Sequence, residues 1–521
     1  MKTTSRQLIR LAFVAALLNL VLFGIGAAAG DASARERYVP DDGYYYVVLA
    51  QNFAEHGEWT FDGETTATGF HPLHAYLAAT AAYVSLSSAF GFAILFGLAL
   101  VLLVASSARR RAVKHDDASI LASAAIILSS LGVVYNTISA TEWALAVAIS
   151  WYYWRAHFEE ETRQGAWSVL ALGAAGSLAR FEFVGLTIAV AASSALVALF
   201  EDGRRTNLRE SLAGVAGAAF GAAIVAAHNF AISGAALSSS SRVKLHWSEL
   251  VGHSPLPFLA TASRSILSAP RFSDVPAFKY AFVVIILTVG AIVAWFIIRR
   301  LRRSSSLKSE ASAYLGEAQN APVVAALLTL AGYAAFYSFN AGGAQLWHSS
   351  LIVVPAATLL RRAVRFGLRR RERATAYVVA SAVGWNVAFT LASPPFHQEQ
   401  AGAAAFGVAL AERHPDSRVA AWDAGVVGYH ANRAVINLDG LVNDEAVPYI
   451  IGDSIETYLA RKEIDILAQE PYGDRARLGL ADFDLEPYLE RDTIAGRVAC
   501  IVDRERLVQR LHEREEYNAS R

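Results

Sequence analysis

The chain has 521 residues, 54% of them hydrophobic, and its formal net charge at pH 7 is zero. Its mean hydropathy is positive, and this apolar content exceeds that of ordinary soluble globular proteins. The composition therefore excludes a purely soluble protein, and we expect an integral membrane protein with no nucleic-acid partner.

Apolar runs long enough to cross a bilayer recur along most of the chain. A transmembrane helix needs roughly 17 to 25 mostly apolar residues, and about eleven candidates meet this need. They lie near residues 11–29, 88–106, 118–135, 141–155, 166–179, 183–200, 211–232, 279–298, 321–339, 346–360 and 375–392. The predicted fold class is an α-helical polytopic membrane protein with about eleven transmembrane helices.

Clusters of basic residues alternate with loops that are poor in cations. If the N-terminus is cytoplasmic, these clusters fall on the inner side, as the positive-inside rule requires. The clusters are Arg109–Arg111 with Lys114, Arg299–Arg303, and Arg361–Arg373. We therefore predict a multi-pass plasma-membrane protein with a cytoplasmic N-terminus. The first loop (30–72), the loop 233–278 and the chain after residue 392 would then be extracytoplasmic.

The chain beyond residue 392 has the composition of a soluble domain. Its short β-like runs, "RVAAWD", "AVINLD", "IDILAQ" and "RVACIVD", alternate with helix-like stretches, which is typical of one compact α/β domain. We therefore divide the chain into a transmembrane domain, residues 1–392, and a soluble extracytoplasmic α/β domain, residues 393–521. Because Cys500 is the only cysteine, the second domain cannot close an internal disulfide and must bury a core.

Two further segments have simple interpretations. The N-terminal apolar run is followed by Ala32-Ser33-Ala34, which is typical of a signal-peptidase site. The run is longer than a usual signal core, so we expect an uncleaved first span. The segment 301–320 is rich in serine and charge and predicts a polar cytoplasmic linker.

The stretch "RYVPDDGYYY", residues 37–46, places two aspartates side by side after the first apolar run. Tyr45, Leu49 and Phe53 recur every four residues before Gly57, which predicts a short amphipathic helix at the outer membrane face. An aspartate at the start of that helix would stabilise it by about 1 kcal/mol, which explains one aspartate but not two. A carboxylate there could act as a general base toward a hydroxyl, and its neighbour could hold a divalent cation.

Other ionisable residues lie near predicted span ends. His71 and His74 are three residues apart at a helix start, a spacing that suits either interfacial packing or ligands. Glu142, Arg180 and Glu182 interrupt apolar stretches. A charge at bilayer depth costs roughly 2.5 to 3.5 kcal/mol, so such residues are functional candidates. Alternatively, Arg180 forms an ion pair with one of the glutamates and only joins helices.

Two more stretches carry candidate ligand-binding groups. Arg242, Lys244 and His246 alternate after a serine run, which suits one face of an extended segment aimed at a phosphate. In the segment 340–350, His348 follows a glycine pair and a tryptophan that is typical of an interfacial anchor. In the C-terminal domain, "WDAGVVGY" places a Gly-x-x-Gly turn after a strand, without the spacing of a dinucleotide-binding fingerprint.

These motifs together resemble the GT-C superfamily of multi-span glycosyltransferases, including bacterial and archaeal mannosyl- and arabinosyltransferases. The resemblance rests first on "PDDGYYYVVLAQNFAEHGEWTFDGETTATGFHPL", with its acidic pair, short helix and Gly-Phe-His-Pro re-entry. The turn around Glu142, "ARFE" at Arg180, and the stretch from Asn229 to Lys244 follow in the order of that group. "WDAGVVGY" and "VINLDGLVND" are similar to the external tail of many bacterial members.

The resemblance implies a role for each matching residue. Asp41 would be the general base, and Asp42 a supporting carboxylate that could bind Mg²⁺, Mn²⁺ or Ca²⁺. Glu142 and Glu182 would complete the acidic site. The groups expected to bind the lipid phosphate or other parts of the substrates are Arg180, Arg242, Lys244, His71, His246 and His348.

The implied reaction is an inverting sugar transfer. Asp41 would accept the proton of an acceptor hydroxyl while its oxygen attacks the anomeric carbon and the polyprenyl phosphate departs. The expected partners are the lipid bilayer, a polyprenyl-phosphate-linked sugar donor, and a glycan, lipid or protein acceptor of the cell envelope.

Two other classes of protein remain as alternatives. A transporter or flippase of a lipid-linked or charged solute would place ionisable residues near mid-span, whereas Glu142, Arg180 and Glu182 fall at predicted outer ends. A non-catalytic sensor with an external ligand-binding tail would leave the paired aspartates unexplained.

Overall fold

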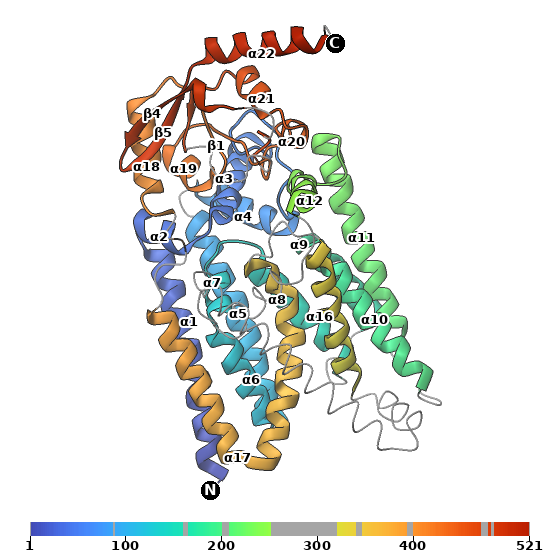
Figure 1. Ribbon diagram of the computed structural model, residues 1–521. Coiled ribbons are helices and arrows are strands. Elements are labelled where there is room, and N and C mark those ends of the chain that lie inside the picture. The colour runs from blue at the N-terminus through green and yellow to red at the C-terminus, as the bar shows by residue number, and fades with distance from the viewer. Residues whose placement is uncertain are drawn as a thin grey trace.

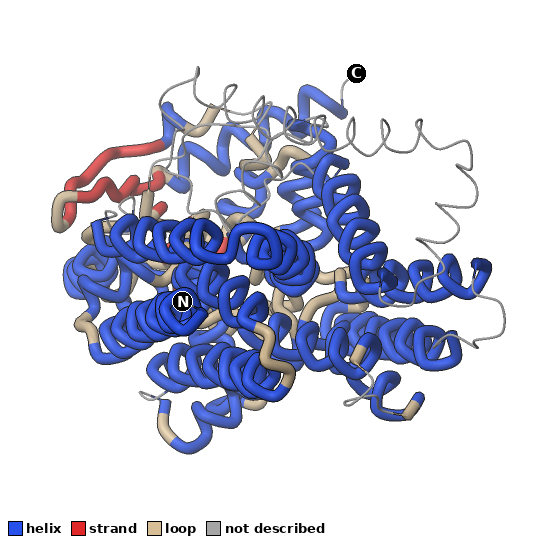
Figure 2. The backbone as a smooth tube through the Cα atoms, turned by 90° about the horizontal axis from the view of Figure 1, so that it is seen from below, coloured by secondary structure: helices blue, strands red, loops and turns tan. Residues whose placement is uncertain are grey.

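In the computed structural model most of the chain is helical, and the strands lie on one side of the molecule (Figure 2). The described residues are 2–86, 89–159, 165–200, 208–251, 320–339, 346–392, 397, 400–469, 478–480 and 484–519. The predicted span 279–298 and almost all of the predicted linker 301–320 lie outside these residues. The glycine pair that precedes His348 also lies outside them.

A bundle of apolar helices forms the N-terminal part of the molecule (Figure 1). Each predicted span that falls on described residues lies on a helix of this bundle. The helices are α1 (Lys2–Ala29), α5 (Ala89–Lys114), α6 (Ala118–Ser129), α7 (Leu131–Thr137), α8 (Trp143–Phe158), α9 (Ala166–Ala179), α10 (Phe183–Phe200), α11 (Leu208–Ser233), α16 (Ala321–Phe339) and α17 (Val353–Ala392), with the 3-10 helix η5 (Leu346–Ile352) before α17.

Helix α17 is a hairpin of two arms. Arg371, with φ of −144° and ψ of 65°, leaves the helical conformation between them. The predicted spans 346–360 and 375–392 therefore lie mainly on the first and second arm. The turn between the arms lies at the same end of the bundle as the N-terminus (Figure 1).

Part of the bundle has the length and apolarity of membrane spans. Among the described helices, α1, α5 and α11 are long and apolar enough to cross a membrane, and α6 with α7 make a fourth span if the bent pair counts as one. Large apolar side chains such as Leu22, Phe220 and Trp385 are more than half exposed on the bundle, which is typical of a lipid-facing surface. The helical membrane fold is therefore confirmed, whereas the count of about eleven spans stays a prediction.

An outer layer of short helices covers the end of the bundle that lies opposite the N-terminus (Figure 1). It contains α2 (Ala32–Tyr38), α3 (Asp41–His56) and α4 (Pro72–Val84). Helix α3 is the predicted short helix. It follows Pro40 and ends at Gly57, whose left-handed φ of 76° suits a glycine C-cap. Helix α4 begins at Pro72, as the Gly-Phe-His-Pro motif predicts.

The C-terminal part, which we call the tail, is built around a five-stranded sheet of order β2-β1-β3-β5-β4. Its strands are β1 (Val419–Ala421), β2 (Val435–Asn437), β3 (Ile466–Leu467), β4 (Leu489–Ile494) and β5 (Arg497–Val502). Its helices are α18 (Ala403–Arg413), α19 (Gly425–Ala431), α20 (Val447–Ile451), α21 (Ile455–Arg461) and α22 (Arg504–Ala519). Strands β2, β1 and β3 are parallel, whereas β5 runs antiparallel to β3 and β4. The four predicted β-like runs are confirmed, and β4 is an additional strand.

The tail packs directly on the outer layer, at the end of the molecule away from the N-terminus (Figure 1). One core of buried side chains joins Tyr44 and Leu49 of α3, Phe90 of α5, and Phe406 and Val426 of the tail. The two predicted domains therefore share a hydrophobic core. This arrangement agrees with an extracytoplasmic tail, but the membrane side of each terminus stays a prediction.

The backbones of the outer layer and the tail meet at Gly69, which lies before α4. A Cβ atom on Gly69 would collide with the carbonyl oxygen of Leu441, so the contact requires a residue without a side chain. We expect Gly69→Ala to destabilise the protein by about 1–3 kcal/mol or more, seen as a lower thermal unfolding midpoint and faster limited proteolysis of the tail. Gly91→Ala in α5 is the control, because nothing lies within 4 Å of its added Cβ. Equal effects of the two substitutions would contradict the prediction.

Candidate active site

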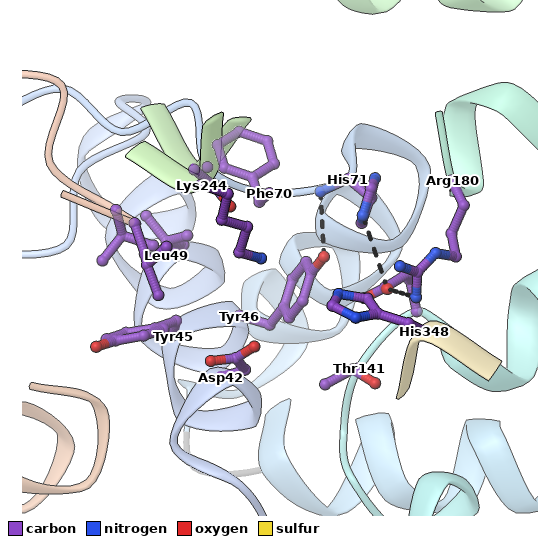
Figure 3. A pocket seen from close by; sticks show the side chains of 15 residues that line it. Asp42, Tyr45, Tyr46, Leu49, Phe70, His71, Thr141, Arg180, Lys244 and His348 are labelled. Atoms are coloured by element: carbon purple, nitrogen blue, oxygen red, sulfur yellow. Dashed lines mark hydrogen bonds and ion pairs between the residues drawn. The ribbon is translucent and has the colours of Figure 1, made fainter. Parts of the chain in front are cut away.

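A small pocket lies where the bundle, the outer layer and the tail meet (Figure 3). Its volume is about 60 Å³, which is room for roughly two water molecules. It is lined by Asp42, Tyr45, Tyr46, Leu49, Gly69, Phe70, His71, Thr141, Glu142, Arg180, Ser240, Lys244, His348, Leu441 and Val442. Five of the predicted substrate-binding residues and one of the two aspartates thus come together here.

Asp42 lies in the first turn of α3 and points into the pocket (Figure 3). Lys244 enters the same space from α12 (Ser239–Val251). Burial raises the pKa of the Asp42 carboxyl; Lys244 opposes this shift, and the negative charge of Glu142 adds to it. A carboxylate whose pKa is raised toward the working pH is a more effective general base.

Asp41, the predicted base, points toward the tail instead. One of its carboxylate oxygens accepts a hydrogen bond from the backbone N–H of Gly425 at 2.9 Å, and the other accepts one from Val426 at 2.8 Å. Consecutive helical residues are about 100° apart around the axis, so the two aspartates of α3 point in different directions. The geometry therefore favours Asp42 over Asp41 as the residue that meets a substrate.

Arg180 is the centre of a buried charge network behind the pocket. Its Nη1 donates to Oε1 of Glu142 at 2.9 Å, and its Nη2 donates to Oε1 of Glu182 at 3.2 Å. Arg180 and Glu142 are 2% and 3% exposed. These charges therefore have both of the expected roles. Their ion pairs join helix ends, and Arg180 and Glu142 also line the pocket. Glu182 does not line it and supports Arg180 from behind.

The two histidines near the start of α4 differ in their surroundings. His71 lines the pocket, and its Nε2 lies 3.7 Å from Oε1 of Glu142. Its backbone N–H donates to the hydroxyl of Tyr46 at 3.1 Å. Burial lowers the pKa of His71, and the charge of Glu142 partly offsets this shift. His74 is buried, and its Nε2 is 3.1 Å from the carbonyl oxygen of Ala140, so His74 packs against the backbone rather than facing a ligand.

His348 lies in η5 and closes one side of the pocket (Figure 3). Its ring stacks on Tyr337, with the ring centroids 5.0 Å apart. The hydroxyl of Tyr337 in turn donates to Glu182 at 3.2 Å. The histidine that sequence reasoning placed beside an interfacial tryptophan is thus connected to the charge network around Arg180.

The predicted extended segment at 242–246 is a helix, so the prediction of an alternating basic face was wrong. The hydroxyl of Ser238 accepts a hydrogen bond from the backbone N–H of Ser241 at 3.2 Å, as a helix N-cap does. Residues two apart on a helix point about 200° away from each other. Arg242 accordingly forms an ion pair with Asp444 of the tail, while Lys244 enters the pocket and His246 does not line it.

The pocket does not offer the ligands of a divalent cation. Among the residues that the structure describes, no group of three His, Cys, Asp or Glu side chains is arranged to hold a metal ion. Glu142 is paired with Arg180, and Asp42 shares its space with Lys244. Because Mg²⁺ and Ca²⁺ bind through carboxylate oxygens and both carboxylates of the pocket already face cations of the protein, this donor set does not fit them, and we derive no step through a metal at Asp42.

Tyr45 connects α3 to the edge of the tail sheet. Its hydroxyl donates to Oδ2 of Asp439 at 3.0 Å and accepts from Nδ2 of Asn437 and the backbone N–H of Ala424, both at 3.1 Å. These partners follow or end the parallel strands β1 and β2, at the sheet edge where α/β folds usually take a ligand. In this chain, α3 occupies that edge. Sequence reasoning missed this contact because Tyr45 counted only as part of an apolar stripe.

The contact between α3 and the tail should depend on pH. Burial and the nearby Asp423 raise the pKa of Asp41 to about 7, compared with about 3.9 for an unperturbed aspartate. Between these values the folded state binds the proton more tightly than the unfolded state, so Asp41 lowers stability as pH rises from about 4 to 7, by up to a few kcal/mol. Asp423→Asn removes one cause of the shift, so we expect its thermal unfolding midpoint to fall less than that of the wild type over this range. A steeper fall in the variant would contradict the prediction.

Comparison with known proteins gives three kinds of result. A family model described as a domain of unknown function, DUF8728, matches residues 391–503. A search of curated protein sequences found no match.

Among solved structures, the chain is similar to the crystal structure of ArnT from Cupriavidus metallidurans in the apo state, with 14% identity, coverage of 92% of this chain and 97% of that chain, and a TM-score of 0.48. It is also similar to ArnT from the same organism bound to undecaprenyl phosphate, with 14% identity, coverage of 94% and 97%, and a TM-score of 0.43. A third match is the archaeal oligosaccharyltransferase AglB from Archaeoglobus fulgidus, in complex with an inhibitory peptide and a dolichol-phosphate, with 12% identity, coverage of 87% and 69%, and a TM-score of 0.42.

All three solved structures are under 15% identical to this chain and have TM-scores below 0.5. A TM-score below 0.5 does not carry an activity from one protein to another, so the site must be judged by its own geometry.

Proposed function

We propose that this protein is an integral membrane glycosyltransferase that moves a sugar from a polyprenyl-phosphate donor to a hydroxyl acceptor on the outer side of the membrane. The observation that carries the proposal is the pocket itself, in which the partly buried carboxylate of Asp42 faces the same space as the cations Lys244 and Arg180. A carboxylate base and phosphate-binding cations are the two groups that this reaction requires.

The reaction assigns each group a step. Asp42 accepts the proton of the acceptor hydroxyl as the oxygen forms a bond to the anomeric carbon. The bond from that carbon to the phosphate oxygen breaks at the opposite face, with inversion, and the phosphate leaves with the electron pair. Lys244 and Arg180 stabilise the negative charge that builds on the departing phosphate. Because the cavity of about 60 Å³ is too small for a sugar ring, substrate binding must widen it.

The position of the pocket suits a lipid-linked donor. Its lining combines Glu142 and His348 of the bundle with Asp42 and His71 of the outer layer, so a prenyl chain could stay in lipid while its phosphate and sugar reach Asp42. Leu441 and Val442 of the tail line the same pocket. The tail therefore forms part of the substrate site, and we assign it to acceptor positioning.

The test is sugar transfer by the purified full-length protein, supplied with labelled polyprenyl-phosphate sugars extracted from membranes. We expect Lys244→Met to lower kcat/KM by about 10²–10³-fold, as loss of one charge-stabilising group does, through weaker donor binding as well as a slower chemical step. Lys114→Met, at the far end of α5 from the pocket, is the control and should leave transfer unchanged. Uptake of a lipid-linked solute by proteoliposomes without any glycosylated product would overturn the proposal in favour of a transporter or flippase.

A further inference from the structure

A second and larger cavity lies inside the bundle, away from the candidate active site. Its volume is about 520 Å³, within the range of about 300 to 1,000 Å³ that small-molecule sites usually have. Side chains of α5, α6 and α8 form one wall, and the first arm of α17 and the start of α16 form the other. None of its lining residues takes part in the proposed sugar transfer.

The upper part of this cavity is apolar. Its lining includes Val133, Trp143 and Val353 at this end, and Trp143 directly follows Glu142 of the active-site pocket. From Trp143 the cavity follows α8 down to Glu159, a distance of about 24 Å at the helical rise of 1.5 Å per residue. This length approaches the roughly 30 Å of a bilayer's hydrocarbon core. A hydrocarbon chain is the ligand that such a long apolar cavity would bury.

The lower end is strongly basic. Six arginines and a single glutamate line the cavity there: Arg111, Arg155, Arg361, Arg362, Arg365, Arg369 and Glu159. Glu159 forms ion pairs with Arg111 and Arg155, at 2.6 and 2.8 Å, and Arg361 pairs with Asp117 at 2.7 Å. Within the described part of the chain, Arg365 and Arg369 add positive charge that neither of these two carboxylates balances, so the described lining at this end is basic.

We propose that this cavity binds an anionic membrane lipid, with its phosphate group among the arginines and one hydrocarbon chain along the apolar walls toward Trp143. Charge complementarity selects an anionic headgroup over a zwitterionic one, because Arg365 and Arg369 carry positive charge that neither Glu159 nor Asp117 balances. The apolar walls select a lipid over free phosphate, which would leave them empty. Four of the arginines lie on the first arm of α17 just before its turn at Arg371, and that turn lies at the end of the bundle that holds the N-terminus (Figure 1). This lipid would therefore come from the leaflet opposite the sugar-transfer site.

A bound lipid would link α5 and α8 to the first arm of α17 across the cavity. Its headgroup would connect α5 and α8 with the exposed residues Arg365 and Arg369 on α17, and its chain would support Trp143. The indole N–H of Trp143 donates to the hydroxyl of Ser349 at 3.3 Å, next to His348 of the active-site pocket. The lipid is therefore expected to stabilise the bundle.

The test uses full-length protein that has been stripped of lipid and reconstituted into nanodiscs of phosphatidylcholine, with or without phosphatidylglycerol. Native mass spectrometry then counts the lipids that each protein molecule retains. We expect one tightly held phosphatidylglycerol and a higher thermal unfolding midpoint in its presence. Equal retention of phosphatidylcholine would overturn the proposal, as would retention of neither lipid.

Two variants and one competitor sharpen this test. Replacing Arg365 and Arg369 together by alanine should lower phosphatidylglycerol retention by at least about tenfold, whereas alanine at Arg109 and Arg110, exposed residues of α5 outside the cavity, should not. Ala108→Trp fills the cavity without changing its charge and should also prevent retention. Undiminished retention in both cavity variants would overturn the proposal.

The competitor is millimolar inorganic phosphate, tested on the unmodified protein, so this result does not depend on whether a variant folds. Displacement of the lipid by phosphate would show a free-anion site instead and would also overturn the proposal.

Discussion

Replacing Asp42 by asparagine should lower the rate of sugar transfer by about 10²–10⁴-fold, the usual contribution of a general base. Asparagine keeps the size of the side chain but cannot accept the proton of the acceptor hydroxyl. The loss should fall on kcat, with little change in donor KM, because donor binding rests on Lys244 and Arg180 in the proposed mechanism. Single-turnover transfer from a labelled donor, measured over a range of pH, distinguishes this loss from weaker binding.

Asp41→Asn is the matched comparison, since it makes the same chemical change one residue earlier. Asp41 faces the backbone N–H groups of Gly425 and Val426 rather than the pocket, so we expect this variant to keep most of its transfer activity once its tail is docked. Limited proteolysis reports whether the tail is docked. A deeper loss in Asp41→Asn than in Asp42→Asn, with the tail intact, would return the base role to Asp41.

Replacing Arg180 by methionine should destabilise the protein by about 3–5 kcal/mol, because it leaves the charges of Glu142 and Glu182 buried without their partner. The thermal unfolding midpoint measures this loss, and transfer activity should fall with it because Arg180 also lines the pocket. Adding Glu142→Gln to the same protein should recover part of the stability, since one unpaired charge is then removed.

Arg418→Met provides the control for this substitution. Arg418 pairs with Glu64 at 2.5 Å, but the two side chains are 38% and 43% exposed, and exposed ion pairs contribute only about 0–1 kcal/mol. If Arg180→Met cost no more stability than Arg418→Met, the buried network around Arg180 would be secondary to the packing of the helices.

Local signals in the sequence were sufficient to predict the elements around the site. Helix α3 could be predicted from the four-residue recurrence of Tyr45, Leu49 and Phe53 and from the glycine at 57. The start of α4 could be predicted from Pro72, because proline fits the first turn of a helix. Four of the five tail strands were also predictable, because their apolar residues are continuous. Strand β4, "LERDTI", has three adjacent charged residues that suit a sheet edge but hide a strand from an apolar pattern.

Which aspartate of the pair lines the pocket and which one binds the tail could not be predicted. Residues 41 and 42 are equally acidic in the sequence, and only the position of the tail, almost 400 residues later in the chain, decides which one it binds. A different long-range contact with the tail underlies the wrong prediction at 242–246. A serine run can begin a helix or belong to an extended segment, and the partner of Arg242, Asp444, lies far away in the sequence. Long-range contacts of this kind leave no local periodicity.

Helix α3 carries Asp42 on one side and contacts the tail through Asp41 and Tyr45 on another. The two parts of the chain should therefore evolve as one unit. In related sequences, substitutions at position 45 should be accompanied by compensating changes at 437 and 439. Exchange of tails between distant homologues should inactivate the chimaera unless α3 is exchanged with the tail.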